Sequence, residues 1–221
     1  MPPEWLTFLA EASLTLGFLC ALVIVVDLLT GHPQKMAVMN VTWPITALYF
    51  GPLALWAYYA FGRTKKQEGD APEKPFWQSV FVGVTHCGGG CTVGDVIAEW
   101  GVFWLGWTIA GASLWPAYIA DFLLAYLFGI AFQYFAIVPM RHLSPGEGLK
   151  AAVKADTLSL TAYEVGMFVW MGIVYFVLFH PHLKPMMPVY WFMMQIAMII
   201  GFVSAYPMNW WLIKKGIKEA M

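Results

Sequence analysis

The stretch from Thr85 to Asp95, THCGGGCTVGD, contains the residue types that point most directly to chemistry. It places His86, Cys87, Cys91 and Asp95 within ten residues of an otherwise apolar sequence. Imidazole and thiolate together suit Cu(I), Zn(II) or an iron centre, and thiolate with thioether favours Cu(I). We therefore interpret His86, Cys87 and Cys91 as a candidate metal site, with copper as the first choice and zinc or iron as alternatives.

Three successive glycines, Gly88–Gly90, separate the two cysteines, and each costs a helix roughly 1 kcal/mol relative to alanine. If the segment stays helical, Cys87, Cys91, Asp95 and Glu99 recur every four residues along one drifting stripe, and His86 stands to one side. If the glycines break the helix, His86 and both cysteines can converge on one ion, and we expect this break. In the competing interpretation the glycines only permit close helix crossing, and the cysteines are small buried hydrophobes.

The composition is that of a membrane protein. Of 221 residues, 60% are hydrophobic and only 11% are charged, whereas soluble domains carry about 25% charged residues. The formal net charge of −1 gives no indication of nucleic-acid binding. The three cysteines do not make a disulfide framework, although a bond between Cys87 and Cys91 stays open.

Apolar runs predict an all-α polytopic membrane bundle in a single domain, residues 1–221, with the lipid bilayer as its surroundings. We expect six spans, with the first retained and not cleaved as a signal peptide. The third is longer than one straight helix needs, so we expect it to be broken or kinked at Gly88–Gly90. The expected spans are 5–29, 36–62, 76–107, 115–140, 157–179 and 189–213.

The distribution of lysine and arginine predicts the orientation of these six spans. With cytoplasmic N- and C-termini, ten of the twelve Lys and Arg residues fall on the inner side, and only Lys35 and Lys184 fall outside. This bias follows the positive-inside rule. We therefore expect a multi-pass protein of the bacterial inner (cytoplasmic) membrane with both termini in the cytoplasm.

Further polar and soft residues could serve a transport pathway. Carboxylates inside apolar spans cost roughly 2.5–3.5 kcal/mol each at the bilayer centre, so they should face the bundle interior or a wet cavity. Asp95, Glu99, Asp121 and Glu164 are candidates for a pathway or for coupled protons. Sulfur ligands and surface histidines extend the set, namely Met167 and Met194 as axial partners and His32, His180 and His182 as an outer metal collar.

Several strings together resemble a known family. They are HCGGGCTVGD, FQYFAI at 132–137, ADTLSLTAYEVGMF at 155–168, FMMQIAM at 192–198 and YPMNWWLIKKGIKEAM at 206–221. From Met36 onward the chain is similar to an uncharacterised family of bacterial multi-pass membrane proteins, a domain of unknown function. The resemblance implies an integral membrane protein and no particular reaction.

The residues favour a protein that binds, and in our interpretation transports, a soft metal ion. The alternatives are a non-catalytic subunit or assembly factor of a larger membrane complex, or a membrane thiol oxidoreductase that uses the cysteine pair. A homo-oligomer also stays open, and enzymatic activity is not indicated. No lysine lies inside a span, which argues against retinal, and only His86 is deep, which argues against bis-histidine haem. Nucleotide-binding motifs do not occur in the sequence.

Overall fold

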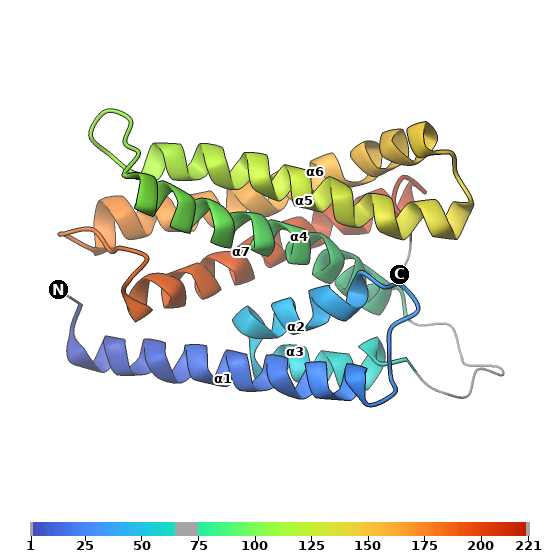
Figure 1. The fold of residues 1–221 in the computed structure, drawn as a ribbon, viewed down its shortest axis with the longest axis horizontal. Coiled ribbons are helices and arrows are strands. Elements are labelled where there is room, and N and C mark those ends of the chain that lie inside the picture. Colours follow the sequence, from blue (N-terminus) through green and yellow to red (C-terminus); the bar gives the residue numbers. More distant parts are fainter. Residues whose placement is uncertain (1, 65–74, 220–221) are drawn as a thin grey trace.

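The computed structural model describes residues 2–64 and 75–219, and every regular element in this part of the chain is helical. Figure 1 shows the helices lying roughly along one axis. The predicted all-α bundle is thus confirmed. The elements are α1 Glu4–Leu29, α2 Met39–Phe50, α3 Pro52–Ala57, α4 Phe76–Leu105, α5 Leu114–Arg141, α6 Pro145–Ile173 and α7 Pro188–Lys214, with π-helical turns at Tyr58–Gly62 and Val174–Leu178.

Five helices in the described residues are long and apolar enough to cross a membrane, namely α1, α4, α5, α6 with its π-helical turn, and α7. Each has 26 or more residues, against the roughly 20 that a bilayer requires. Their outward faces carry large apolar side chains, such as Phe18 on α1, Leu123 on α5 and Val203 on α7, each more than half exposed. Such faces are suited to lipid contact, because apolar side chains are the ones that hydrocarbon accepts.

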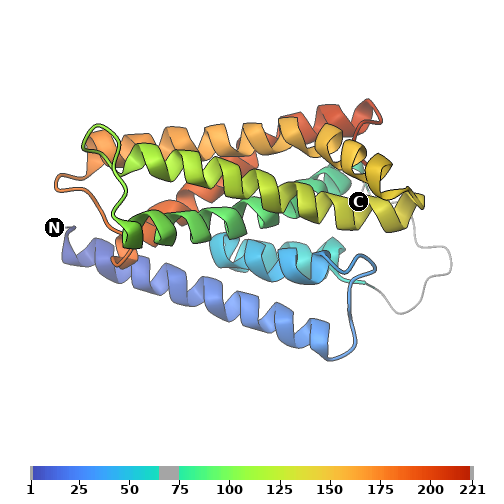
Figure 2. The ribbon, with the colours of Figure 1, turned by 45° about the horizontal axis from the view of Figure 1, so that its top comes forward.

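The segment predicted as a second span, 36–62, does not cross the bundle. α2 runs inward, the chain turns at Gly51, and α3 returns toward its starting point, so that α2 and α3 form a helical hairpin between α1 and α4 (Figures 1 and 2). Arg63, just past the hairpin, forms an ion pair with Asp27 at the end of α1, 2.7 Å apart. A second crossing would have placed these two residues at opposite ends.

The tip of the hairpin is held by the residues around it. Gly51 adopts φ +55°, a conformation that favours glycine, and Pro52 begins α3. The Leu48 carbonyl next to the turn accepts a 2.6 Å hydrogen bond from Gln195 Nε2 on α7. Non-helical backbone at membrane depth is tolerated only where protein or a wet cavity satisfies it, and Gln195 supplies that partner.

The two ends of the bundle differ in charge. At the end where α1 and α5 finish and α4 and α6 begin, which we call the basic end, lie eight of the nine described Lys and Arg residues. The ninth, Lys184, lies at the other end, which we call the pocket end. Lys65, Lys66 and Lys74 fall outside the described residues, in the segment between Thr64 and Pro75. Lys35, expected on the opposite side, belongs to the basic end because the hairpin does not cross.

An odd number of long helices separates the chain ends. α1 begins at the pocket end and α7 finishes at the basic end (Figure 1). The expectation that both termini share one side is therefore wrong. The physical reason is the hairpin, which reverses direction inside the bundle and removes one crossing from the predicted six.

α4 lies at the centre and contacts α2, α5, α6 and α7. It is one helix from Phe76 to Leu105, so the expected break at Gly88–Gly90 is wrong. The glycines instead let neighbours approach closely. A Cβ added at Gly90 would lie 2.8 Å from the Gly129 Cα of α5, and one at Gly89 would lie 2.6 Å from Thr42 Cγ2 of α2. Burial against several helices offsets the low helix propensity of the glycines.

α6 begins earlier than the predicted fifth span. The segment 141–154, which lies between the predicted fourth and fifth spans, becomes helical at Pro145, where Ser144 and Glu147 form a reciprocal capping box. The Ser144 hydroxyl lies 2.6 Å from Glu147 Oε2.

Candidate functional site

The continuous α4 places its chemically active residues on one inward stripe. Cys87, Cys91 and Asp95 are completely buried and Glu99 is 6% exposed. They recur every four residues, as the helical alternative in the sequence required. Gly90 and Cys91 are the fifteenth and sixteenth of the 30 residues of α4, so the stripe runs from the middle of the bundle to the pocket end.

His86 does not join the cysteines. In a continuous helix the residue before Cys87 is rotated by about 100° from it, and His86 interacts electrostatically with Lys218 and Asp156. Among residues 2–64 and 75–219, no three His, Cys, Asp or Glu side chains are grouped so as to hold a metal ion. The predicted convergence of His86, Cys87 and Cys91 on one point is therefore wrong, because it depended on a helix break.

Four acidic side chains from three helices form what we call the carboxyl cluster: Asp95 and Glu99 of α4, Asp121 of α5 and Glu164 of α6. All four are buried, as predicted. Asp95 interacts electrostatically with Glu99 and Glu164. Asp121 interacts electrostatically with all three of the other acids. Both carboxylate oxygens of Asp95 and of Glu164, and Oδ1 of Asp121, have no hydrogen-bond partner. Unpaired charge in such a place costs several kcal/mol, so it requires a proton or a cation.

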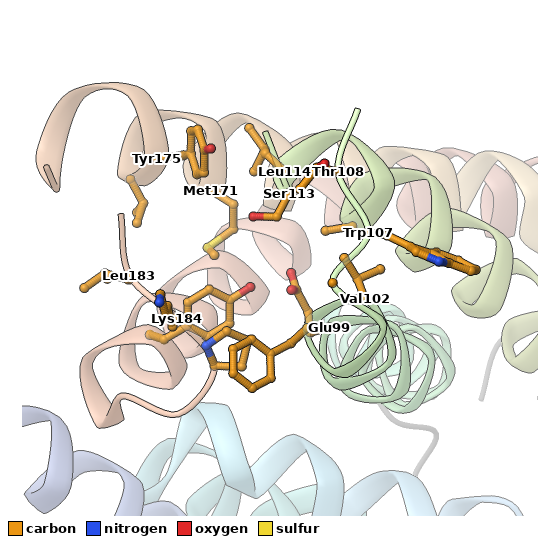
Figure 3. Close-up of a pocket in the computed structure, with 16 residues that line it drawn as sticks. Glu99, Val102, Trp107, Thr108, Ser113, Leu114, Met171, Tyr175, Leu183 and Lys184 are labelled. Atoms are coloured by element: carbon orange, nitrogen blue, oxygen red, sulfur yellow. The ribbon is translucent and has the colours of Figure 1, made fainter. Parts of the chain in front are cut away.

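A cavity of about 360 Å³ opens at the pocket end, with Glu99 among its lining residues. Figure 3 shows the Glu99 carboxylate pointing into this cavity, with Met171 and Ser113 also facing it and Lys184 on one side. Tyr190 lies beside Glu99. The cavity therefore connects the pocket end to the first member of the carboxyl cluster.

The two cysteines lie between the carboxyl cluster and the basic end, and both are free thiols. Glu164 neighbours Cys91. The cysteines share one buried apolar cluster with the methionines of α6 and α7, including the predicted Met167 and Met194, each 1% exposed. Soft thioether and thiol groups thus surround the middle of α4, although the structure gives no set of converging ligands.

The hairpin tip contributes a tyrosine to this level of the bundle. A Cβ added at Gly88 would lie 3.1 Å from the Tyr49 hydroxyl of α2 and 3.0 Å from the Tyr163 ring of α6. Both hydroxyls are buried without a hydrogen-bond partner. Polar groups therefore continue past Cys91 toward the basic end.

A second polar cluster, which we call the inner cluster, lies nearer the basic end and consists of Asp156 and Ser159 of α6, Asn209 of α7 and Lys218 of the C-terminal tail. Lys218 Nζ donates to Asp156 Oδ1 at 2.9 Å and to Ser159 Oγ at 3.4 Å. Asn209 Nδ2 donates to the same Ser159 Oγ at 2.7 Å. The Asp156 and Lys218 side chains are both 0% exposed.

The charge of Lys218 is maintained in this buried position. Burial lowers the pKa of Lys218, but the charge of Asp156, together with its hydrogen bond and interactions with the two cysteines, raises it by more. The net pKa is above the ordinary value, so the ammonium group is charged at neutral pH. A positive charge thus occupies the inner cluster.

These groups define a line that we call the polar column: the pocket-end cavity, the carboxyl cluster, the cysteine pair and the inner cluster. The sequence indicated the carboxyl cluster and the cysteine pair, but it missed the cavity lining apart from Glu99 and all of Asp156, Ser159, Asn209 and Lys218. Asp156 preceded the predicted fifth span, and Lys218 was counted only as a cytoplasmic charge. The signal in the sequence was a lone asparagine inside an apolar run followed by a basic tail, NWWLIKKGIK.

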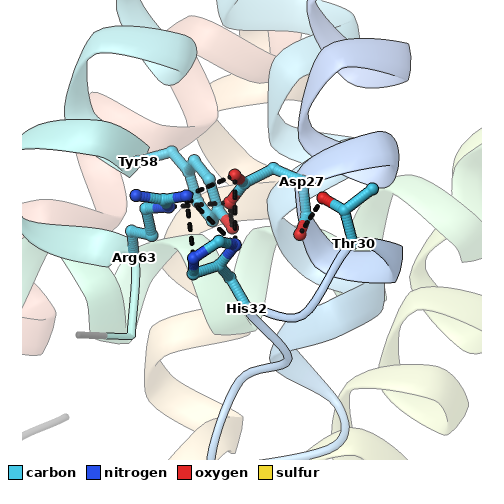
Figure 4. A network of polar contacts seen from close by, with 5 residues as sticks. All are labelled: Asp27, Thr30, His32, Tyr58 and Arg63. Atoms are coloured by element: carbon cyan, nitrogen blue, oxygen red, sulfur yellow. Dashed lines mark hydrogen bonds and ion pairs between the residues drawn. The ribbon is translucent and has the colours of Figure 1, made fainter. Parts of the chain in front are cut away.

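The predicted outer collar of His32, His180 and His182 does not form. His32 lies at the basic end, where its Nδ1 is 3.4 Å from Asp27 Oδ1 and its ring contacts Arg63 (Figure 4). His180 and His182 lie at the pocket end, where His182 stacks on Tyr175 at 3.7 Å between ring centroids. The hairpin separates the two groups, because it keeps the chain after α1 at the basic end.

Comparison with known proteins gives a family and no characterised relative. No curated protein and no solved structure matches the chain. One family model, described as a domain of unknown function (DUF4396), matches residues 76–218. The match begins at the first residue of α4 and ends at Lys218, so it contains the carboxyl cluster, the cysteine pair and the inner cluster, but neither α1 nor the hairpin. The chain belongs to this family, DUF4396.

Proposed function

We propose that the protein moves a cation across a membrane through the polar column. The observation that carries this proposal is the carboxyl cluster. Three helices bury four acidic side chains together, and five of their oxygens lack a hydrogen-bond partner. Apolar side chains in these places would be more stable. Ionisable groups retained at membrane depth despite this cost are characteristic of ion and proton pathways.

The membrane orientation belongs to the same proposal. Basic residues concentrate on the cytoplasmic side of membrane proteins, so the basic end faces the cytoplasm. The N-terminus and the pocket-end cavity then face the outside, and the inner membrane of a bacterium is the membrane concerned. A cation would enter the cavity at Glu99, pass the carboxyl cluster and reach the cysteine pair in the middle of α4.

The cysteine pair supports Cu(I) as the cargo. Cys87 and Cys91 lie one helical turn apart on the same stripe, inside a cluster that includes Met167, Met194 and Met198. Thiolate and thioether groups bind Cu(I) in preference to hard cations. His86 is left out of this site, in contrast to the prediction from the sequence, because in the continuous α4 it is rotated by about 100° from Cys87.

Elemental analysis of the purified protein tests the cargo. We expect copper to co-purify after growth in copper, and the variant Cys87→Ser/Cys91→Ser to lose it. Cys20→Ser is the matched control, since Cys20 is also a buried free thiol but belongs to the cluster of α1 with the hairpin. Equal copper in the double variant and the wild type would exclude the cysteine pair as the binding site.

Proteoliposomes test the column itself. Uptake of Cu(I), kept reduced with ascorbate, and of protons, read with an enclosed pH dye, should fall about tenfold or more in Glu164→Gln, since the carboxylate charge is removed from the pathway. Glu147→Gln, at the exposed cap of α6, should behave as wild type. Proton flux without copper uptake would support the polar column as a cation pathway and would show that Cu(I) is not its cargo. Absence of both fluxes in the wild type would reject the proposal.

A further inference from the structure

The inner cluster has more acceptor groups than its ammonium group uses. Lys218 Nζ contacts Asp156 Oδ1 and Ser159 Oγ. Asp156 Oδ2 and Asn209 Oδ1 are buried and have no hydrogen-bond partner, and neither ring nitrogen of the neighbouring His86 has one. Asp156 and Asn209 are 0% exposed. Polar atoms buried so completely are normally all paired, so these acceptors require an explanation.

A glycine on the neighbouring helix lets α5 pack closely against the aspartate. A Cβ added at Gly129 of α5 would lie 3.1 Å from Asp156 Oδ2. The lysine, in contrast, does not come from a transmembrane helix. It reaches the cluster from the tail after Lys214, where α7 ends, and the tail is also held by an ion pair between Glu219 and Arg141. The positive charge is therefore delivered by a short segment that follows the last residue of α7.

We propose that Asp156, Ser159 and Asn209 form a second cation site, at the basic end of the polar column, and that the Lys218 ammonium occupies it as a tethered substitute for a free monovalent cation. This inference rests on the proposed function for its role in transport. A hard monovalent cation that arrives along the column, as distinct from the Cu(I) that the cysteine pair would bind, displaces Lys218, and the tail closes the site again after that cation has left. The chemistry of the site, a carboxylate with hydroxyl and amide oxygens, suits a small hydrated or ammonium-type cation.

Binding at this site can be tested without any transport measurement. In Lys218→Ala the ammonium is removed, and we expect the melting temperature in detergent to fall. Added methylammonium chloride should restore it by about 5 °C in a saturable manner, because a ligand that binds only the folded state stabilises it. Wild type, whose site is filled, and Asp156→Asn/Lys218→Ala, whose carboxylate charge is removed, should not respond. Tetramethylammonium chloride at equal ionic strength is too large and serves as the salt control.

A second variant allows the same test if Lys218→Ala does not fold. Lys218→Met keeps the apolar length of the side chain and removes only the charge, and ammonium chloride is then the probe. If neither variant responds to its cation, or if the Asp156→Asn double variant responds equally, the inner cluster is a structural ion pair and the proposal is wrong.

Flux through proteoliposomes tests the link to transport. If the tethered ammonium closes the column, Lys218→Met should pass protons about tenfold faster than wild type, while Lys215→Met, in the exposed part of the same tail, should not. Cation binding without faster proton flux would support the cation site but would show that Lys218 does not close the polar column. Fast flux in Lys218→Met without any cation response would reject the site and leave the proposed transport function intact.

Discussion

Arg63 and Asp27 form a two-bonded ion pair at the basic end, with Nε and Nη2 of the arginine 2.9 and 2.7 Å from the two carboxylate oxygens (Figure 4). One residue follows the hairpin and the other ends α1. Because the chain between them leaves and re-enters the same end, this pair excludes a membrane crossing by the hairpin. It reduces the predicted six crossings to five.

The first prediction concerns this topology. A cysteine introduced as Thr30→Cys should be protected from a membrane-impermeant maleimide in intact cells and become labelled after permeabilisation, because position 30 lies at the basic end, which the proposed orientation places in the cytoplasm. Thr108→Cys, between α4 and α5 at the pocket end, should label in intact cells. The native cysteines are all buried and give a low background. Equal labelling of both variants from outside would restore the six-span arrangement.

The second prediction concerns the ion pair itself. Asp27→Asn should lower the free energy of unfolding by about 2 kcal/mol, because it removes a charge from a two-bonded, partly buried pair. The Asp27 side chain is 11% exposed. Adding Arg63→Gln to that variant should cost much less than Arg63→Gln alone. Thermal unfolding of the four proteins measures this coupling, and additive losses would mean that the pair contributes nothing.

The third prediction concerns the glycines of α4. Gly90→Ala should destabilise the protein by about 2 kcal/mol or more, since the added carbon would meet the α5 backbone at Gly129. Gly101→Ala on the same helix has open space around it and should stabilise by up to about 1 kcal/mol through helix propensity. Thermal unfolding in one detergent compares them. A stabilising Gly90→Ala would contradict the close packing of α4 on α5.

The fourth prediction separates stability from function in the carboxyl cluster. Glu164→Gln should leave the melting temperature unchanged or raise it, because it replaces a buried acid without hydrogen-bond partners by a neutral group of the same shape. The same variant should lose transport in proteoliposomes. Loss of stability together with transport would show instead that Glu164 holds the fold together.

The sequence was sufficient to predict the long helices, but it did not predict correctly where the chain turns and where a helix continues. Residues 36–62 met the length and polarity of a span, and only the Gly51-Pro52 dipeptide signalled a turn. The opposite error arose at Gly88–Gly90, where three glycines signalled a turn that tertiary packing prevented. Local propensity is worth roughly 1 kcal/mol per residue, so tertiary contacts that no local pattern encodes decided both outcomes. The hairpin contacts α1, α4 and α7, and the glycines of α4 contact α2, α5 and α6.

The candidate site was also predicted only in part. Asp95 and Glu164 were identified because a carboxylate inside an apolar run is costly wherever the helix faces. The ion pair of Asp156 and Lys218 was not predicted, because the two residues are 62 positions apart and each lies near the end of a predicted span. The assignment of His86 to the cysteines failed because it depended on the backbone between them and not on residue types.

The hydrogen bond from Gln195 to the Leu48 carbonyl also constrains how the protein is made. The two residues are 147 positions apart, so the ribosome has released the hairpin long before α7 is synthesised. During that interval the turn at Gly51 has no Gln195 to satisfy it, and an unpaired carbonyl is costly in hydrocarbon. We therefore expect the hairpin to reach its final depth only once α7 is present to supply Gln195.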